Sequence, residues 1–430
     1  MQRRVVVTGI GCVSPVGNDP LSAWKAVRNG DSGVARISRF DAANYPTQIA
    51  AEVRNFDLSR WMADVAAYAK CGANVRYGLA AAIQAMQDSD LDLNHLPDPS
   101  RFGVYLGGGE GAQDFNLFMG LVAQAADAQG NIDLQRFTTA GMQQLDAGFE
   151  AAQEPGVLAS HIAGLFGAEG PNLNTLTACA ASAQAIGEGS ELIRRGAADI
   201  MLVGGAHSMI HPFGVTGFCL LTTLSKRNDA PESASRPFDR ERDGFVLGEG
   251  AAMLVIEDYE HARQRKARIY GEVRGYGVAA DAYRITDIPP DGSGVARAMR
   301  LSLRHAGLNA EDIQYVNAHG TSTSANDRTE TVALKSVFGD HAYGIPVSST
   351  KSTTGHLVAA CGGLEAIFCL LALNDKTIPP TSNYEYPDPA CDLDYVPNTA
   401  RETPLKHVMS NNSGFGGQNV SLIFSQLSTA

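Results

Sequence analysis

The chain has 430 residues, of which 44% are hydrophobic and 7% aromatic, and it contains 45 glycines. This length and composition favour a tightly packed α/β protein with a large core and many close backbone contacts. The formal net charge is -12. We therefore expect no non-specific binding to nucleic acid or to an anionic membrane.

The seven cysteines form no C-x-x-C pair, so they predict neither a structural zinc site nor a disulfide framework. This cysteine usage suits a reducing, cytoplasmic location. Residues 2–11 are basic and then apolar, but glycines interrupt the apolar run too early for a signal sequence. We predict a first strand there. The most apolar stretch, 364–373, is shorter than the ~20 residues of a membrane-spanning helix and indicates a buried helix.

Short β-branched segments alternate with alanine-rich helical segments, a pattern typical of βαβ units and buried strands. The predicted strands are 4–8, 102–106, 199–204, 252–257, 269–277, 313–318, 345–349, 406–410 and 420–425. The predicted helices are 62–89, 180–195, 294–306, 328–337 and 362–373. The pair Cys71-Gly72 is a candidate break in the first of these helices.

The two halves of the chain resemble each other in design. In each half a strand leads into a helix rich in glycine and alanine, after Cys179 in the first half and after His356 in the second. Helices made of such small residues can be buried on all sides, between two sheets. The charged stretch 257–266 is the natural seam, so we predict one half over residues 1–260 and another over 261–430.

Cys179 lies in the segment 175–182, at a predicted strand-to-helix turn. A helix N-terminus favours the thiolate through its dipole and its free N–H groups. The backbone N–H of the residue itself can stabilise an oxyanion, as in a nucleophile elbow. On this motif alone, a catalytic nucleophile and a buried structural cysteine are equally good interpretations.

A second motif, 317–323, places His319 in a polar loop after an apolar strand. The loop carries hydroxyls able to bind an amide-bearing substrate arm. Asp327 and Glu330 follow closely, and they either hold this loop, balance the charge of Lys351, or cap the helix that is predicted from residue 328.

A third motif, 351–356, contains Lys351 in a weakly charged stretch and His356 at the start of an apolar helix. The lysine either pairs with a buried acid or extends to the surface. The imidazole Nε2 of the histidine is placed to donate to a carbonyl oxygen. In a fourth motif, 411–419, glycines surround Phe415, and this segment is either a ligand-facing loop or a plain β-turn.

One thiol with two distant histidines and a lysine indicates carbon–carbon or acyl-transfer chemistry rather than metal binding. The glycine-rich segment 107–111 follows a strand and loosely fits a dinucleotide-binding fingerprint. It lacks a convincing acid-terminated βαβ unit, and we interpret it as a tight turn at the edge of a substrate cavity.

The four motifs, in this order and together with the segments 5–11 and 235–251, resemble the β-ketoacyl carrier-protein synthases, especially the condensing enzyme II group. The resemblance covers nearly the whole chain. It implies an α/β thiolase-like fold, in which two similar halves form five layers (α-β-α-β-α), normally in a homodimer.

The resemblance also implies roles for individual residues. The family's nucleophile falls on Cys179, and backbone N–H groups of Cys179 and Phe415 form its oxyanion hole. Phe415 also gates the acyl pocket. The other implied positions are the histidine pair His319 and His356, the lysine Lys351, the supporting acid Glu330, the phosphopantetheine-binding Thr321 and Thr323, Thr286 in a mobile entrance loop (281–286), and the substrate-binding Phe218.

The implied reaction loads an acyl group from acyl carrier protein onto Cys179. The histidines then assist decarboxylation of a malonyl thioester, and the resulting enolate attacks the acyl-enzyme. Neither a metal nor a redox cofactor is required. Two alternatives stay open: a non-catalytic chain-length-determining partner subunit, and a thiolase-like enzyme that uses coenzyme A esters.

Three departures concern substrate and partner. Glu110 stands where the family has an apolar residue in the acyl pocket, which favours a specialised pathway over ordinary saturated chains. The segment 116–155 looks expanded. The segment 62–70 lacks a basic cluster for the acidic carrier, and the alternative docking residues are Arg194, Arg195, Lys226 and Arg227.

Overall fold

The computed structural model describes residues 3–93, 96, 98–109 and 114–427. Ten strands form one sheet in the order β10-β9-β13-β14-β8-β1-β7-β6-β4-β5. The strands of the first half of the chain are β1 (Val5–Val13), β4 (Phe102–Gly107), β5 (Asn172–Thr175), β6 (Ile200–His207) and β7 (Gly250–Asp258). Those of the second half are β8 (Gly271–Ala280), β9 (Tyr315–Asn317), β10 (Val347–Ser348), β13 (His407–Gly414) and β14 (Gln418–Ser425).

The two sets of strands have the same topology. In the first half, β1 pairs antiparallel with β7, β7 antiparallel with β6, and β6 and β5 each pair parallel with β4. In the second half, β8, β14, β13, β9 and β10 repeat these relations in the same sequence order. The sets meet only where Val6 pairs with Glu272 and Val7 with Gly271, between β1 and β8. The chain therefore contains two copies of one five-stranded arrangement.

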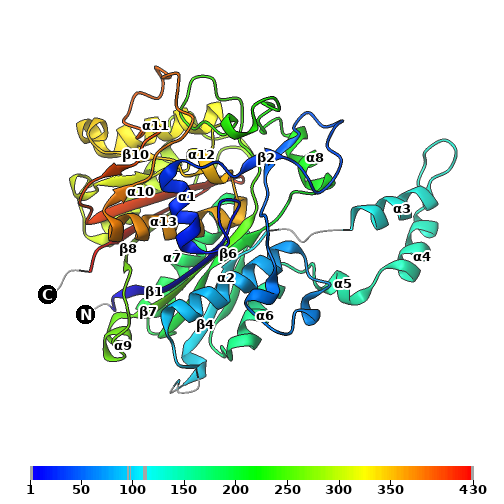
Figure 1. Cartoon of the computed structure of the whole chain (residues 1–430), viewed down its shortest axis with the longest axis horizontal. Helices are drawn as coiled ribbons and strands as arrows, with labels where there is room; N and C mark the ends of the chain where they lie inside the picture. Colours follow the sequence, from blue (N-terminus) through cyan, green and yellow to red (C-terminus); the bar gives the residue numbers. More distant parts are fainter. Residues whose placement is uncertain (1–2, 94–95, 97, 110–113, 428–430) are drawn as a thin grey trace.

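Two central helices, α7 (Ala181–Arg194) and α13 (Cys361–Asp375), contact each other and strands of both halves. Nearly every residue of α13 is buried, which explains its continuous apolar sequence. On the outer faces, α2 (Ala73–Ser89) covers β1 and β7, and α10 (Ser293–Ala306) covers β8 and β14 with α11 (Ser324–Phe338) beside it. Figure 1 shows the resulting alternation of helical and sheet layers, and the five-layer expectation agrees with it.

All nine predicted strands coincide with strands of the structure, and four of the five predicted helices coincide with helices. The fifth prediction, a helix over 62–89, is wrong in its first part. Residues before Cys71 form only a short 3-10 turn, Ala66–Tyr68, and α2 begins after Gly72. Ala66 and Ala67 are exposed and only Tyr68 packs partly against the core, so this alanine-rich stretch gains too little packing to extend a helix.

The remaining elements connect these layers. They are α1 (Pro20–Asn29), β2 (Val34–Arg36), β3 (Ile49–Ala51), α3 (Phe115–Ala125), α4 (Leu134–Gln144), α5 (Ala147–Ala151), α6 (Val157–Phe166), α8 (Pro212–Leu220), α9 (Tyr259–Gln264), α12 (Lys351–Thr354), β11 (Thr377–Ile378) and β12 (Arg401–Glu402). In Figure 1, α3 and α4 extend away from the body as an arm. Apolar side chains of this arm are exposed, among them Met142 and Leu134.

Among the described residues, one segment, Val358–Asp375, has the length and composition of a membrane-crossing helix, and 89% of it is buried inside the protein. It includes α13, which packs against strands of both halves of the ten-stranded sheet. The expectation of a buried helix at 364–373 is confirmed by this packing.

Candidate active site

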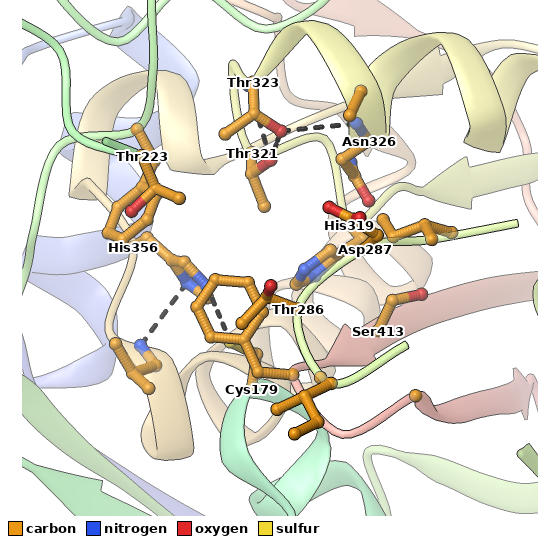
Figure 2. Close-up of a pocket in the computed structure, with 18 of the residues that line it drawn as sticks. Cys179, Thr223, Thr286, Asp287, His319, Thr321, Thr323, Asn326, His356 and Ser413 are labelled. Atoms are coloured by element: carbon orange, nitrogen blue, oxygen red, sulfur yellow. Dashed lines mark hydrogen bonds between the residues drawn. The ribbon is translucent and has the colours of Figure 1, made fainter. Parts of the chain in front are cut away.

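Cys179 lies in a single 3-10 turn, Ala178–Ala180, between β5 and α7. The preceding residue, Ala178, has a φ of 47°, a left-handed conformation that residues with a Cβ rarely adopt. This turn aims the thiol at the cavity shown in Figure 2, and the Cys179 side chain lines it. The backbone N–H groups of Phe415 and of Cys179 itself lie close enough to Sγ to act on the pKa of the thiol.

Burial raises the pKa of the Cys179 thiol to about 12, although the charge of Lys351 and the two backbone N–H groups act in the opposite direction. The sequence-based expectation that the helix N-terminus favours the thiolate is therefore outweighed in the unliganded protein. Removal of water from around Sγ costs the charged form more than the nearby positive potential returns. The resting residue is a thiol.

The His356 imidazole contacts the Cys179 thiol, with Nε2 3.0 Å from Sγ. Its Nδ1 accepts a hydrogen bond of 3.3 Å from the backbone N–H of Val358. Burial, followed by the charge of Lys351, lowers the pKa of His356 well below its usual range, so the ring is neutral. Because Nδ1 is an acceptor, the single proton of the neutral ring resides on Nε2. His356 therefore presents a hydrogen-bond donor to the cavity.

His319 approaches from the opposite side of the cavity (Figure 2), with its ring centroid 5.3 Å from that of His356. It lies on the loop between β9 and α11. Thr323 directly precedes α11, and its side chain caps the helix by accepting from the N–H of Asn326. Burial lowers the pKa of His319 well below its usual range, with a further contribution from Lys351. Both rings are thus neutral and nearly perpendicular.

Glu330 of α11 fixes the backbone of the loop that carries His319. Its two carboxylate oxygens accept the backbone N–H groups of His319 at 2.9 Å and Gly320 at 2.8 Å. Burial raises the pKa of Glu330 to about 7, against the effect of these two hydrogen bonds. Of the roles left open by the sequence, holding the loop is the one that this geometry provides. Asp327 instead pairs with Arg242 and accepts the backbone N–H of Phe238.

Lys351 is fully buried and forms an ion pair with Glu365 of α13. The other oxygen of Glu365 accepts from the Asn412 side chain at 2.6 Å. Burial disfavours the charged form of Lys351, but the Glu365 carboxylate outweighs this and raises its pKa. Glu365 was not among the residues expected from the sequence. The sequence feature that could have identified it is that Glu365 is the only charged residue in the apolar stretch 361–373.

The cavity above Cys179 has a volume of about 170 Å³. Thr321 and Thr323 line it, with their hydroxyl oxygens 2.9 Å apart, and so does Thr286. The segment with Thr286 is tied to the turn that carries Phe415, because the N–H of Gly416 donates to the carbonyl of Ile285. The structure therefore brings to one cavity the three threonines that the sequence predicted to contact the substrate arm.

A second cavity of about 620 Å³ begins behind Phe415 and Phe218, which line both cavities. Phe218 stacks edge-on against Phe245, with ring centroids 5.6 Å apart, and Phe245 contacts His356 in the same way. Phe415 lies on the turn between β13 and β14. Glu110, the residue expected in the acyl pocket, lies outside the described residues.

The thiol Sγ and ring nitrogens of His319 and His356 lie within 4.8 Å of one another, a spacing that a metal ion could also use. The positive charge of Lys351 lowers the pKa of both histidines, and the same field opposes binding of a cation. The donor and acceptor roles of His356 fit a substrate oxygen better than a metal.

The sequence matches two family models, "Beta-ketoacyl synthase, N-terminal domain" over residues 2–262 and "Beta-ketoacyl synthase, C-terminal domain" over residues 270–385. It is 44% identical over 430 residues to the 3-oxoacyl-[acyl-carrier-protein] synthase 2 of Coxiella burnetii, with 99% of both chains covered. The protein of the same name from Vibrio cholerae is 42% identical over 428 residues, which are 99% of this chain and 100% of the relative. The chain belongs to the beta-ketoacyl synthase family.

Solved structures agree with this assignment. A beta-ketoacyl synthase from Burkholderia phymatum superposes with a TM-score of 0.87 at 34% identity, covering 99% of this chain and 100% of that one. A type II polyketide synthase acyl-carrier protein in complex with its ketosynthase bound to the hexaketide gives a TM-score of 0.86 at 33% identity, with both chains fully covered. The thiolase-like fold and the acyltransferase class, both expected from the resemblance, are confirmed.

Proposed function

We propose that the protein condenses an acyl group held on Cys179 with a malonyl group carried by acyl carrier protein, and so lengthens a fatty-acid or polyketide-type chain. The observation that carries this proposal is the meeting of Cys179 Sγ, His319 and His356 in one cavity, with two backbone N–H groups beside the sulfur. The family assignment and the full-length relatives support the same chemistry.

In the first half-reaction, Sγ of Cys179 forms a bond to the carbonyl carbon of an acyl thioester. The thiol of the phosphopantetheine arm leaves and takes the proton that the cysteine loses. The backbone N–H groups of Cys179 and Phe415 hold the negative charge on the carbonyl oxygen. Donors placed in this way each contribute ~10²–10³-fold in rate. This transfer starts from a thiol, which is the resting form of Cys179. The neutral His356 already carries its proton on Nε2, so the leaving thiolate, and not His356, takes the proton of the cysteine.

In the second half-reaction, the bond between the malonyl methylene carbon and its carboxylate breaks and carbon dioxide leaves. The electron pair that remains forms an enolate, which attacks the acyl carbon and displaces the Cys179 sulfur as a thiolate. The thiolate then takes up one proton from solvent and returns to the resting thiol. His356 and His319 donate to the enolate oxygen. Burial, and after it the charge of Lys351, which is paired with Glu365, lowers the pKa of both histidines and keeps the rings neutral, so they can act as donors rather than as a fixed cationic pair.

Acyl carrier protein is the proposed partner, because the names of the relatives include it and one superposed ketosynthase was solved in complex with its own carrier. Thr321, Thr323 and Thr286 are positioned to bind its phosphopantetheine arm. For the carrier itself, Lys226 and Arg195 are exposed. Arg194 is unsuited, since its side chain is buried and bonds Glu191 and the carbonyl of Val273.

We further propose that two copies of the chain form a homodimer in the cytoplasm. The strand β5 lies at the edge of the ten-stranded sheet, and Leu173 on it is exposed. The second cavity opens beside the exposed Leu176, Leu220 and Leu221. A second copy would cover this apolar rim, whose exposure is unfavourable in a monomer. Within each copy, the halves are residues 1–260, with the nucleophile, and 261–430, with both histidines, Lys351 and Phe415.

Two assays test the function separately. Mass spectrometry after incubation with an acyl-carrier thioester should show an acyl group on Cys179, and addition of malonyl-carrier protein should then yield carbon dioxide and a 3-oxoacyl product. Failure to load would contradict the enzyme assignment in favour of a non-catalytic partner subunit. Loading from coenzyme A esters with no use of malonyl-carrier protein would favour the thiolase-like alternative.

A further inference from the structure

Among the described residues, the wall of the second cavity is apolar with one exception. These residues are glycines, alanines, Leu176, Met209, Phe213, Phe218, Leu220, Leu221, Val358, Phe415 and a single side chain that carries nitrogen or oxygen, His207. An apolar cavity behind the nucleophile suits the hydrocarbon part of an acyl chain. The imidazole has no obvious place in such a wall, and neither half-reaction of the proposed condensation uses it.

His207 is the last residue of β6, and only 1% of its surface is exposed. Neither of its ring nitrogens has a hydrogen-bond partner within the described part of the chain. The ring lies against the backbone of Gly109, where a Cβ would stand 2.2 Å from Nδ1. Only a glycine at position 109 leaves room for the imidazole at this place in the wall.

The ring is uncharged. Burial lowers the pKa of His207 to about 3, and the nearby His211 acts in the same direction. A neutral imidazole offers one N–H donor and one nitrogen acceptor. Buried polar groups in folded proteins are almost always paired, and each unpaired one costs about 1–3 kcal/mol. A ligand that supplies the missing partner would therefore recover this free energy on binding.

We propose that His207 is a specificity-determining residue, which hydrogen-bonds an oxygen atom of the acyl chain carried by Cys179. The inference rests on the proposed function. A saturated hydrocarbon chain would exclude water from the cavity and leave both ring nitrogens unpaired. A hydroxyl group can pair with either nitrogen, and a keto oxygen can accept from the N–H. The preferred substrate is accordingly an acyl chain with a hydroxyl or keto oxygen along its length.

The position of His207 supports this role. It influences the pKa of His356, so it lies near the catalytic cavity as well as in the wall of the second one. Phe218 and Phe415 separate the two cavities, and a chain attached to Sγ must pass them to reach His207. The histidine therefore meets the body of the chain rather than its thioester end, which the backbone N–H groups already bind.

The test uses pairs of acyl-carrier thioesters of equal length, one saturated and one with a hydroxyl or keto group at successive carbons. Loading of Cys179 is measured for each as kcat/KM. We expect at least one oxygen-bearing chain to be preferred over its saturated partner by about tenfold or more, the equivalent of one buried hydrogen bond. In the His207→Leu variant the preference should disappear or reverse. Met209→Leu, a change in the same wall with no polar atom, should keep the preference.

A wild-type protein that loads saturated and oxygen-bearing chains equally well would overturn the inference and leave the proposed function intact. The same holds if His207→Leu and Met209→Leu change the ratio alike, since His207 would then serve only to fill space. If neither class of chain loads, the proposed function fails instead. Should His207→Leu not fold, the wild-type ratio and the polar variant His207→Gln decide the question, because retention of the preference in His207→Gln supports the hydrogen bond.

Discussion

The two halves of the molecule share one topology but contribute different chemistry. In each half a turn with a strained residue precedes a central helix: Ala178, with a φ of 47°, before α7, and Val358, with a φ of 45°, before α13. The first turn presents Cys179. The second lies just after His356, whose ring the N–H of Val358 orients. Residues 177 positions apart therefore meet at 3.0 Å.

The repeated five-stranded arrangement and the strained turn before each central helix determine where the side chains lie. The side chains that differ between the two halves determine the chemistry. The second half also provides His319, Lys351 and Phe415. In the proposed mechanism it holds the enolate and gates the acyl group, whereas the first half holds the covalent intermediate. Variants in the two halves should for this reason fail at different steps.

The largest effect is expected in the first half, from Cys179→Ala. Without Sγ no acyl-enzyme forms, and condensation should fall by roughly 10³-fold or more, as when a covalent nucleophile is removed elsewhere. Loading followed by intact-protein mass spectrometry checks this directly. As a control, Cys219→Ala, a change at a partly exposed cysteine, should still show one acyl adduct per chain. Full loading of Cys179→Ala would disprove the division of roles.

In the second half, Lys351→Met should be the most destabilising change. It leaves the Glu365 carboxylate buried without its ion-pair partner, which typically costs about 3–5 kcal/mol. The double variant Lys351→Met with Glu365→Leu should recover much of that stability but not the condensation rate. Thermal unfolding and the condensation assay are measured on all variants. If the double variant regained activity, the lysine would have no role beyond packing.

Glu365 also shows where sequence reasoning reached its limit. The strands, the buried central helices and the motifs of the cavity could be predicted, because each has a local pattern or a recognisable string of residues. The partner of Lys351 could not, since it lies on another element and only folding brings the two together. The first part of the helix predicted over 62–89 failed for the related reason that helix propensity with little burial does not form a stable helix. The unpaired ring of His207 is likewise visible only in three dimensions.

His319→Ala should separate the steps within the active site. The thiol and the N–H groups of Cys179 and Phe415 stay in place, so loading should continue, while the loss of one donor to the enolate should slow condensation by roughly 10²–10³-fold. The ratio of the loading rate to the condensation rate measures this. An equal loss in both steps would mean that His319 supports the nucleophile instead.

Glu330 gives the second half a pH-dependent contribution to stability. Burial raises its pKa from 4.5 to about 7, so the folded state binds a proton more tightly than the unfolded state does. The corresponding stability is present below pH 4.5 and is lost as the pH rises through about 7. Glu330→Gln should therefore flatten the fall of the melting temperature between these values. The exposed Glu311→Gln serves as control and should leave the slope unchanged.

The smallest effect tests the strained turn itself. At a φ of 47°, Ala178 is in a conformation that costs about 1–2 kcal/mol with a Cβ and much less with glycine. Ala178→Gly should thus leave stability unchanged or raise it by up to about 1 kcal/mol, despite the greater chain entropy of glycine. The same substitution at Ala181, with a φ of -59° at the start of α7, should lower stability by about 1 kcal/mol. Unfolding free energies of the two variants provide the comparison. Ala181 is fully buried and Ala178 only partly, so the Ala181 loss also includes removal of a buried methyl group. A loss of equal size at both positions would show that the turn before Cys179 stores no strain.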